Sequence, residues 1–413
     1  MASGDGRRPG QARSLGGLAP LFGGVVQPIQ RFFSLEAASG ILLLGAALAS
    51  LIWANVAPGS YQSTFGLPLV IGPAGQALTF TARELVNDAL MTLFFFVVGM
   101  EIKRELVLGE LRTFGRAALP AVAALGGMLV PALVYLGFNR SGPARQGWGI
   151  PIATDIAFCI GVLTLLRRRV PQGLIVFLTA LAIFDDIGGI LIIALFFGHG
   201  LQIVWLVVAA AIATLLFAAG TRWVTHGAFY LVGGALLWSA VHQSGIHATI
   251  SGVVLGLAIP ERLLTRFVQR MHPWVAFVIM PVFALANSGI SLQAMTLSDL
   301  LAGVTSGTAL GLLVGKLLGI FTFTVAAVRM GLAPMPGGAS PAKLLGASVV
   351  GGIGFTVALF IAALAFPGDT RLLLQAKLGI LIGSLAAGLI GAAILRATPP
   401  LPPDSLAPAP GFR

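Results

Sequence analysis

The sequence predicts an all-α protein that crosses a membrane many times, and its composition carries this prediction. The chain has 413 residues, of which 57% are hydrophobic and only 9% are charged. A soluble domain usually has about 25% charged residues, so this chain cannot cover a water-facing surface. A single cysteine, Cys159, excludes a secreted scaffold held by disulfides. The net charge of +11 does not indicate nucleic-acid binding, because the basic residues are spread over short loops along the chain.

Twelve apolar segments are candidates for membrane spans, each of which needs about 20 residues as a helix. Two of them, 228–241 and 245–259, are short, and one kinked helix is the alternative for this pair. The count is then eleven. The segments are 34–55, 84–108, 117–138, 150–166, 174–197, 201–219, 228–241, 245–259, 273–290, 310–328, 344–366 and 372–397.

The loops between these segments predict the orientation of the chain. With twelve spans, most of the 25 Lys and Arg residues lie on the side of the two termini. Cytoplasmic loops carry this excess, so both termini are predicted to be cytoplasmic. The transmembrane domain is predicted at 32–397, between a Gly-rich tail at 1–31 and a Pro-rich tail at 398–413, both expected to be disordered. The outer loop at 62–80 predicts either a β-hairpin or an ordinary ordered loop.

Two adjacent acids, Asp185 and Asp186, stand in the middle of the fifth segment. An ionisable side chain inside a span costs about 2.5–3.5 kcal/mol even on a lenient scale, which makes each one a functional candidate. Neighbouring helix positions point about 100° apart, so one carboxylate can face a cavity and the other a counter-charge. Two like charges this close also resist joint ionisation, and we expect the pair to titrate in coupled steps.

The fourth segment is predicted to be broken beside a third buried acid. Pro151 removes a backbone donor shortly before Thr154 and Asp155. The freed carbonyls, the hydroxyl and the carboxylate are hard oxygen donors, which suit small hard cations. The alternative is a simple kink in which Asp155 caps the second half of the helix.

The eleventh segment is the second candidate for a broken helix. Gly351, Gly352 and Gly354 loosen it, although close helix packing through small residues is the alternative. Two interrupted spans, one in each half of the chain, indicate a midplane site in an inverted-repeat transporter. There Asp155 would offset facing positive helix ends. Lys316 in the tenth segment would offset negative ends or pair with a buried aspartate.

Other ionisable side chains lie nearer the ends of spans. His247 either senses pH near neutrality or forms hydrogen bonds across helices. Glu101, Arg104 and Glu105 share one helix face at the predicted cytoplasmic end of the second span. They form either an acidic entrance for cations or a solvated helix end with ion pairs. Asp88 lies in the same span.

Six motifs at these positions resemble the NhaA family of bacterial Na⁺/H⁺ antiporters. They occur in the family's order and spacing, and the resemblance extends over residues 33–366. The motifs are ATDIAF (153–158), LAIFDD (181–186), GIHAT (245–249), HPWVA (272–276), GK (315–316) and GIGFT (352–356).

The resemblance implies a twelve-helix inverted-repeat fold in which the fourth and eleventh helices are interrupted and cross. It implies that Asp185 and Asp186 form the site for Na⁺ or Li⁺ and H⁺, with Asp186 the more central. Thr154 and Asp155 would belong to one crossing chain, and Lys316 would pair with Asp185 or balance the crossing.

The resemblance also implies how the transporter is regulated and assembled. His247, Glu101, Arg104 and Glu105 match positions linked to the pH response, and Asp88 matches a supporting acid. The outer hairpin would join two copies of the chain in the bacterial inner membrane. Exchange would be electrogenic, would serve sodium and pH homeostasis and salt tolerance, and would need no cofactor or ATP.

Two positions depart from the family pattern, and two other classes of protein have features that can be compared with this sequence. Val268 and Gln269 stand where some members have Glu and His, so the resemblance does not imply a pH-activation profile. An intramembrane aspartyl protease also uses buried acids, but its Gly-x-Gly-Asp motif is absent from this sequence. A cation channel would need a carbonyl filter, and the sequence has no such repeat.

Overall fold

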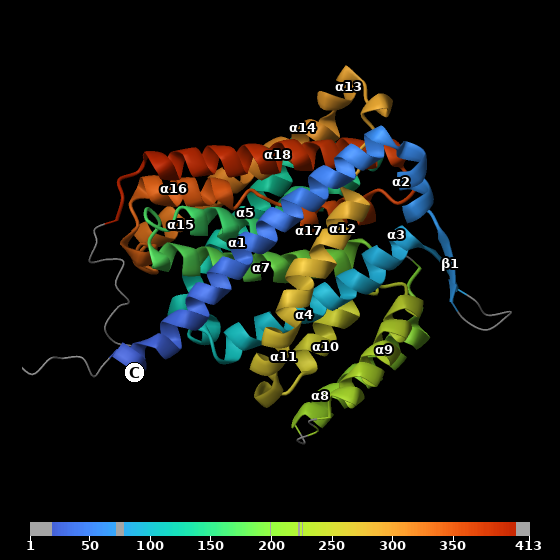
Figure 1. The fold of residues 1–413 in the computed structure, drawn as a ribbon, viewed down its shortest axis with the longest axis horizontal. Coiled ribbons are helices and arrows are strands. Elements are labelled where there is room, and N and C mark those ends of the chain that lie inside the picture. Colours follow the sequence, from blue (N-terminus) through green and yellow to red (C-terminus); the bar gives the residue numbers. More distant parts are fainter. Residues whose placement is uncertain (1–18, 72–77, 199, 222–223, 225, 402–413) are drawn as a thin grey trace, which may run out of the picture.

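The computed structural model describes residues 19–71, 78–198, 200–221, 224 and 226–401. These residues form a bundle of helices with one small β-sheet at its edge (Figure 1). An almost entirely helical fold is what the composition predicts, because inside a bilayer every backbone N–H and C=O group must bond within the protein.

Several helices, among them α7, α16 and α18, lie along the long axis of the bundle, and others, among them α1, α9 and α11, are inclined to it (Figure 1). Three π-helical turns, at Val86–Leu90, Val275–Ile279 and Gly311–Gly315, connect α3 to α4, α11 to α12 and α14 to α15 without a break. The α-helices are α1 (Ala19–Val56), α2 (Pro58–Phe65), α3 (Ala82–Leu85), α4 (Met91–Val107), α5 (Phe114–Phe138), α6 (Ile156–Leu165), α7 (Gln172–Phe196), α8 (Ile203–Thr221), α9 (Gly227–Gln243), α10 (Ile250–Ala258), α11 (Glu261–Trp274), α12 (Met280–Asn287), α13 (Leu297–Leu300), α14 (Gly303–Leu310), α15 (Lys316–Arg329), α16 (Pro341–Val350), α17 (Phe355–Ala365) and α18 (Thr370–Ala397).

Eight helices in the described part of the chain are long and apolar enough to cross a membrane, or up to ten if each of two bent pairs is one span. The 3₁₀ helix Pro143–Ile152 meets α6 at 41°, and α16 meets α17 at 46°. The two remaining predicted spans are α9, with 17 residues, and α10, with 9. The two are separate helices, with residues 244–249 between them.

The ends of the bundle differ in part from the prediction. Helix α1 begins at Ala19, so residues 19–31 are helical where disorder was predicted. Once a helix has formed over the apolar first segment, each further residue adds a hydrogen bond without a new nucleation step. Residues 1–18 and 402–413 of the predicted tails lie outside the described residues.

A short antiparallel sheet stands at the edge of the bundle. Strand β1 (Pro68–Ile71) pairs with β2 (Leu78–Thr81), with Pro68 opposite Thr81. Residues 62–65 of the predicted hairpin range belong instead to α2. We call the end of the bundle that carries this sheet and the start of α18 the hairpin end. The opposite end, where α18 finishes, is the tail end (Figure 1).

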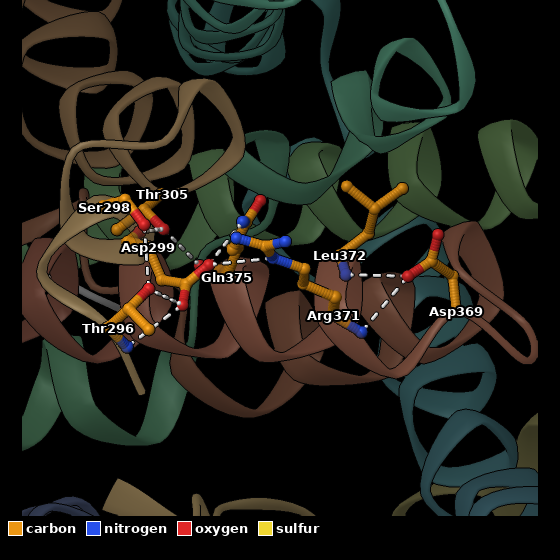
Figure 2. Close-up of polar contacts among 8 residues, drawn as sticks. All are labelled: Thr296, Ser298, Asp299, Thr305, Asp369, Arg371, Leu372 and Gln375. Carbon is orange, nitrogen blue, oxygen red and sulfur yellow. Dashed lines mark hydrogen bonds and ion pairs between the residues drawn. The ribbon is translucent and has the colours of Figure 1, made fainter. Parts of the chain in front are cut away.

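At the hairpin end, a buried aspartate connects α13 to α18 (Figure 2). Asp299 is 2% exposed and its carboxylate accepts hydrogen bonds from Thr296, from Arg371 Nε at 3.2 Å and from Gln375 Nε2 at 2.8 Å. Thr305 donates to the carbonyls of Asp299 and Gln375. These bonds hold the helix formed by α14 and α15 against α18 at the hairpin end.

Three aromatic rings fill the core on the hairpin side of the two helix breaks. Phe360 of α17 lies with its ring centroid 5.7 Å from that of Phe95 and 6.4 Å from that of Phe283. All three side chains are buried, with at most 3% exposed. We refer to Phe95, Phe283 and Phe360 as the aromatic cluster.

Candidate functional site

The two broken helices meet at their breaks in the middle of the bundle. The backbone N–H of Asp155 donates to the carbonyl of Ile353 at 2.6 Å. The Thr154 hydroxyl lies 3.1 Å from the carbonyl oxygen of Gly351. Residues predicted to interrupt two distant spans are therefore in direct contact.

Asp155 caps the two helices that begin at this meeting point. Its Oδ1 accepts from the backbone of Phe158 in α6 at 3.3 Å. Its Oδ2 accepts from Thr356 in α17, at 3.1 Å from the backbone N–H and 2.5 Å from the hydroxyl. One buried carboxylate thus offsets two positive helix ends, which combines the functional expectation for Asp155 with the capping alternative.

The glycines of the second break allow a close approach to the helix that carries Lys316. A Cβ on Gly352 would collide with the carbonyl of Leu312, and one on Gly354 would come within 2.8 Å of the carbonyl of Ala153. A Cβ on Gly351 would lie 2.9 Å from the side chain of Ile320. The glycines therefore both interrupt the helix and allow its close packing, so the two sequence alternatives apply together.

Pro151 and Ser384 support the same region from either side. Pro151 packs so closely on Gly311 that a Cβ there would lie 2.7 Å from the proline ring. Ser384 of α18 accepts from the backbone N–H groups of Gly354 and Phe355, each at 3.3 Å. Sequence reasoning missed Ser384, because one serine in an apolar span gives no pattern to find.

Lys316 and Asp185 form a fully buried ion pair. The Lys316 Nζ lies 2.5 Å from Asp185 Oδ2, and the two side chains have no exposed surface. Lys316 also donates to the Thr154 hydroxyl at 2.8 Å, which itself donates to Asp185 Oδ2 at 2.7 Å. Asp185 Oδ1 has no hydrogen-bond partner among the described residues. The expectation that Lys316 faces a buried aspartate matches this geometry.

Asp186 faces a cavity of about 100 Å³ instead of a counter-charge. Thr154 and Asp155 line the same cavity. The Asp186 carboxylate has no hydrogen bond or ion pair within the part of the chain that the structure describes. The two adjacent acids therefore point at different neighbours, as their 100° separation on α7 predicts.

The cavity extends toward the tail end past the last turns of α4. Glu101, Arg104 and Glu105 line it there, together with His272. Glu101 Oε1 lies 3.3 Å from His272 Nδ1, and Arg104 Nη2 lies 3.4 Å from Glu105 Oε1. These side chains therefore line the cavity and also form ion pairs at the end of the helix, so features of both sequence alternatives are present. The contact between Glu101 and His272 was not predicted, because it joins positions 171 residues apart.

His247 and Asp88 lie apart from this cavity, on the side of the aromatic cluster. Their Nε2 and Oδ1 atoms are 3.6 Å apart, and His247 Nδ1 is 2.8 Å from the Thr249 hydroxyl. The His247 ring centroid is 5.4 Å from that of Phe360. His247 forms a hydrogen bond, as one of the two sequence alternatives expected. Its contact with Asp88 was not predicted.

The donors around the cavity are hard oxygens. Within the described residues, no group of three or more His, Cys, Asp or Glu side chains is placed to hold a metal ion. The available donors are the carboxylates of Asp185 and Asp186 and the Thr154 hydroxyl. Hard oxygens of this kind bind small hard cations, and the carboxylates also bind protons.

Comparisons with known proteins agree along most of the chain. A family model described as Na⁺/H⁺ antiporter 1 matches residues 30–395. The Na(+)/H(+) antiporter NhaA of Anaeromyxobacter sp. (strain Fw109-5) is 53% identical over 438 residues, 95% of each chain. The Na(+)/H(+) antiporter NhaA 1 of Myxococcus xanthus (strain DK1622) is 50% identical over 432 residues, 94% of this chain and 96% of its own.

Solved structures are also similar in fold, and one example illustrates this. It is the sodium proton antiporter MjNhaP1 from Methanocaldococcus jannaschii, with a TM-score of 0.54 and 14% sequence identity. The alignment covers 90% of this chain and 99% of that one. At this identity the similarity concerns the fold alone.

Proposed function

Because the chain belongs to the NhaA family of Na⁺/H⁺ antiporters and exchanges Na⁺ for H⁺, we propose that the two ions compete for Asp185 and Asp186. The observation that carries this proposal is that the two adjacent acids have different surroundings. Asp186 faces a cavity with no partner, and Asp185 keeps one carboxylate oxygen free beside Lys316. The protein is a transporter, so the protease alternative is discarded.

Exchange is obligatory when occupancy is exclusive. A proton and a cation use the same carboxylate oxygens, so each leaves before the other binds. With the cavity open toward the tail end, Na⁺ or Li⁺ displaces protons from Asp185 and Asp186, assisted by Thr154 and its neighbouring carbonyls. The protein then changes the side to which the site opens, and protons from that side displace the cation. A channel, by contrast, needs no proton counterflow.

Exchange in this scheme is electrogenic. Two carboxylates, or one carboxylate and Lys316, carry up to two protons for each cation. The site needs no cofactor, because competition between the two ions supplies all the coupling. Glu101, Arg104, Glu105 and His272 at the entrance, and His247 beside Asp88, are proposed to shape the pH response, since protonation of either histidine changes the charge of its pair.

Transport in sealed vesicles tests electrogenic exchange. We expect an outward Na⁺ gradient to drive proton uptake in vesicles that hold the purified protein, and an imposed potential, negative inside, to accelerate it. The measurement is internal pH, with the potential set by K⁺ and valinomycin, across a series of cations and pH values. Proton uptake that ignores the potential would mean electroneutral exchange and would contradict this part of the proposal.

The topology of the proposed transporter uses α9 and α10 as short spans, which gives twelve spans with two crossed, interrupted helices. The basic residues then place both termini in the cytoplasm and the tail end at the cytoplasmic face of the inner membrane.

We also propose that β1 and β2 join two copies of the chain. The sheet has only two strands, so each keeps an edge of unpaired backbone groups. Replacing residues 68–81 by a short Gly-Ser linker is expected to convert a dimer into a monomer, measured by light scattering during size-exclusion chromatography. The variant should still exchange ions, because this segment is remote from the cavity. A dimer of unchanged mass would rule out this contact.

A further inference from the structure

Three segments with a common basic character meet at the tail end of the bundle. Arg169, in the loop between α6 and α7, donates from Nη1 to the carbonyls of Arg396 and Thr398 at the end of α18, at 2.6 and 2.5 Å. The backbone N–H of Leu401 donates to the carbonyl of Arg168 at 2.9 Å. The loop before α7 and the end of α18 are thus joined directly.

The amino ends of two long helices point to the same place. Helix α7 begins at Gln172 and α16 at Pro341, and the backbone at Gly173 is so near Gly337 that a Cβ on Gly173 would lie 2.6 Å from the Gly337 Cα. The N-terminus of a helix carries a partial positive charge and unpaired N–H groups. In α16, the Ser340 side chain accepts from the N–H of Lys343 and the Ser340 carbonyl accepts from the N–H of Leu344. Pro341 has no N–H, so the N–H of Ala342 is the group left at this helix start among the described residues.

Lys343 is the buried lysine of this region. Only 8% of it is exposed, and its ammonium group has no hydrogen bond or ion pair within the described part of the chain. Its charged neighbour is Arg169, which repels it. The stem of Lys343 is covered by the protein while its ammonium reaches the surface, where it can meet an incoming anion.

The three segments that meet here carry no acid of their own. The stretches 160–176, 336–354 and 388–401 contain no Asp or Glu. At the end of α18, Arg169 binds the carbonyls of Arg396 and Thr398, and Thr398 binds that of Leu395. Arg167, Arg168 and Arg396 are exposed around the buried lysine. We refer to the basic residues here as the tail-end cluster, which consists of Arg167, Arg168, Arg169, Lys343 and Arg396.

We propose that the tail-end cluster binds the phosphate group of an anionic molecule. Guanidinium groups bind phosphate oxygens in pairs, an ammonium adds a point charge, and the N–H groups of α7 and α16 complete the cradle. The group is either the headgroup phosphate of an anionic phospholipid or free phosphate. This site is separate from the cavity at Asp186, whose lining contains none of these residues.

Thermal unfolding of the full-length protein in lipid nanodiscs tests the proposal and separates the two sources. A molecule that binds only the folded state raises the unfolding temperature. We compare phosphatidylcholine discs, the same discs with inorganic phosphate added, and discs that contain phosphatidylglycerol. A rise with phosphatidylglycerol alone identifies a lipid headgroup, and a rise with inorganic phosphate identifies the free anion.

The double variant Lys343→Met with Arg168→Gln is expected to lose most of that rise. The matched control is Arg266→Gln with Arg270→Gln, which removes two exposed charges from α11 outside the tail-end cluster. It should keep the whole rise. Sodium-driven proton flux shows that both variants remain folded. No rise with any addition, or an equal loss in both variants, would overturn the proposal.

Discussion

The variant Asp186→Asn is expected to lose sodium-driven proton flux, down to the level of vesicles without protein. Asparagine has nearly the same size, but its amide neither releases a proton nor attracts a cation. Asp186 has no partner in the described residues and lies next to a second acid, so its replacement breaks no contact and removes a like charge. We expect the free energy of unfolding to stay the same or to rise.

Internal pH in vesicles is the measurement, with thermal unfolding as the test of folding. Glu261→Gln is the matched control, because it neutralises an exposed carboxylate at the start of α11 and should leave flux unchanged. Flux near the wild-type rate in Asp186→Asn would show that the cation and the proton do not meet at this carboxylate.

The variant Lys316→Met is expected to be strongly destabilised. Methionine fills the space of the lysine stem but leaves the carboxylate of Asp185 buried without a counter-charge. Removing one partner of a buried pair typically costs about 3–5 kcal/mol. The unfolding temperature in detergent should fall accordingly. Adding Asp185→Asn should recover most of the loss, because an amide needs no counter-charge.

Lys377→Met is the matched control for that experiment. Lys377 is also buried, with 8% exposed, but it has no acidic partner within the described residues. Its replacement is expected to be neutral or stabilising. If Lys316→Met melted at the wild-type temperature, the ion pair would not exist in the folded protein. If the double variant with Asp185→Asn melted no higher than the single one, the loss would come from packing.

The site residues that could be predicted from the sequence are charged residues inside otherwise apolar spans. Asp155, Asp185, Asp186 and Lys316 stand out because a charge in lipid has a large energetic cost. The structure brings all four to the two breaks, within one region of the bundle. The periodicity of α7 also predicted that its two acids face different surroundings, and they do.

What the sequence did not predict depends on contacts between distant segments. Thr356 and Ser384 carry no charge, and only the fold shows that each bonds a group at the breaks. The π-helical turn before Lys316 leaves no mark beyond Gly311 and Gly315, which close packing also explains. The helical start of α1 was missed because glycine content was taken to outweigh the continuity of an apolar helix.

The aromatic cluster has a consequence for how tightly the membrane stays sealed. Phe95, Phe283 and Phe360 offer no polar atom to a hydrated ion, so neither a water wire nor a sodium ion passes between them. In this conformation the cavity at Asp186 extends toward the tail end, away from the rings. Packed interiors switch between discrete arrangements instead of deforming gradually. If the rings form the seal on this side, leakage of protons depends on how often they separate, and a smaller side chain at Phe360 would raise it.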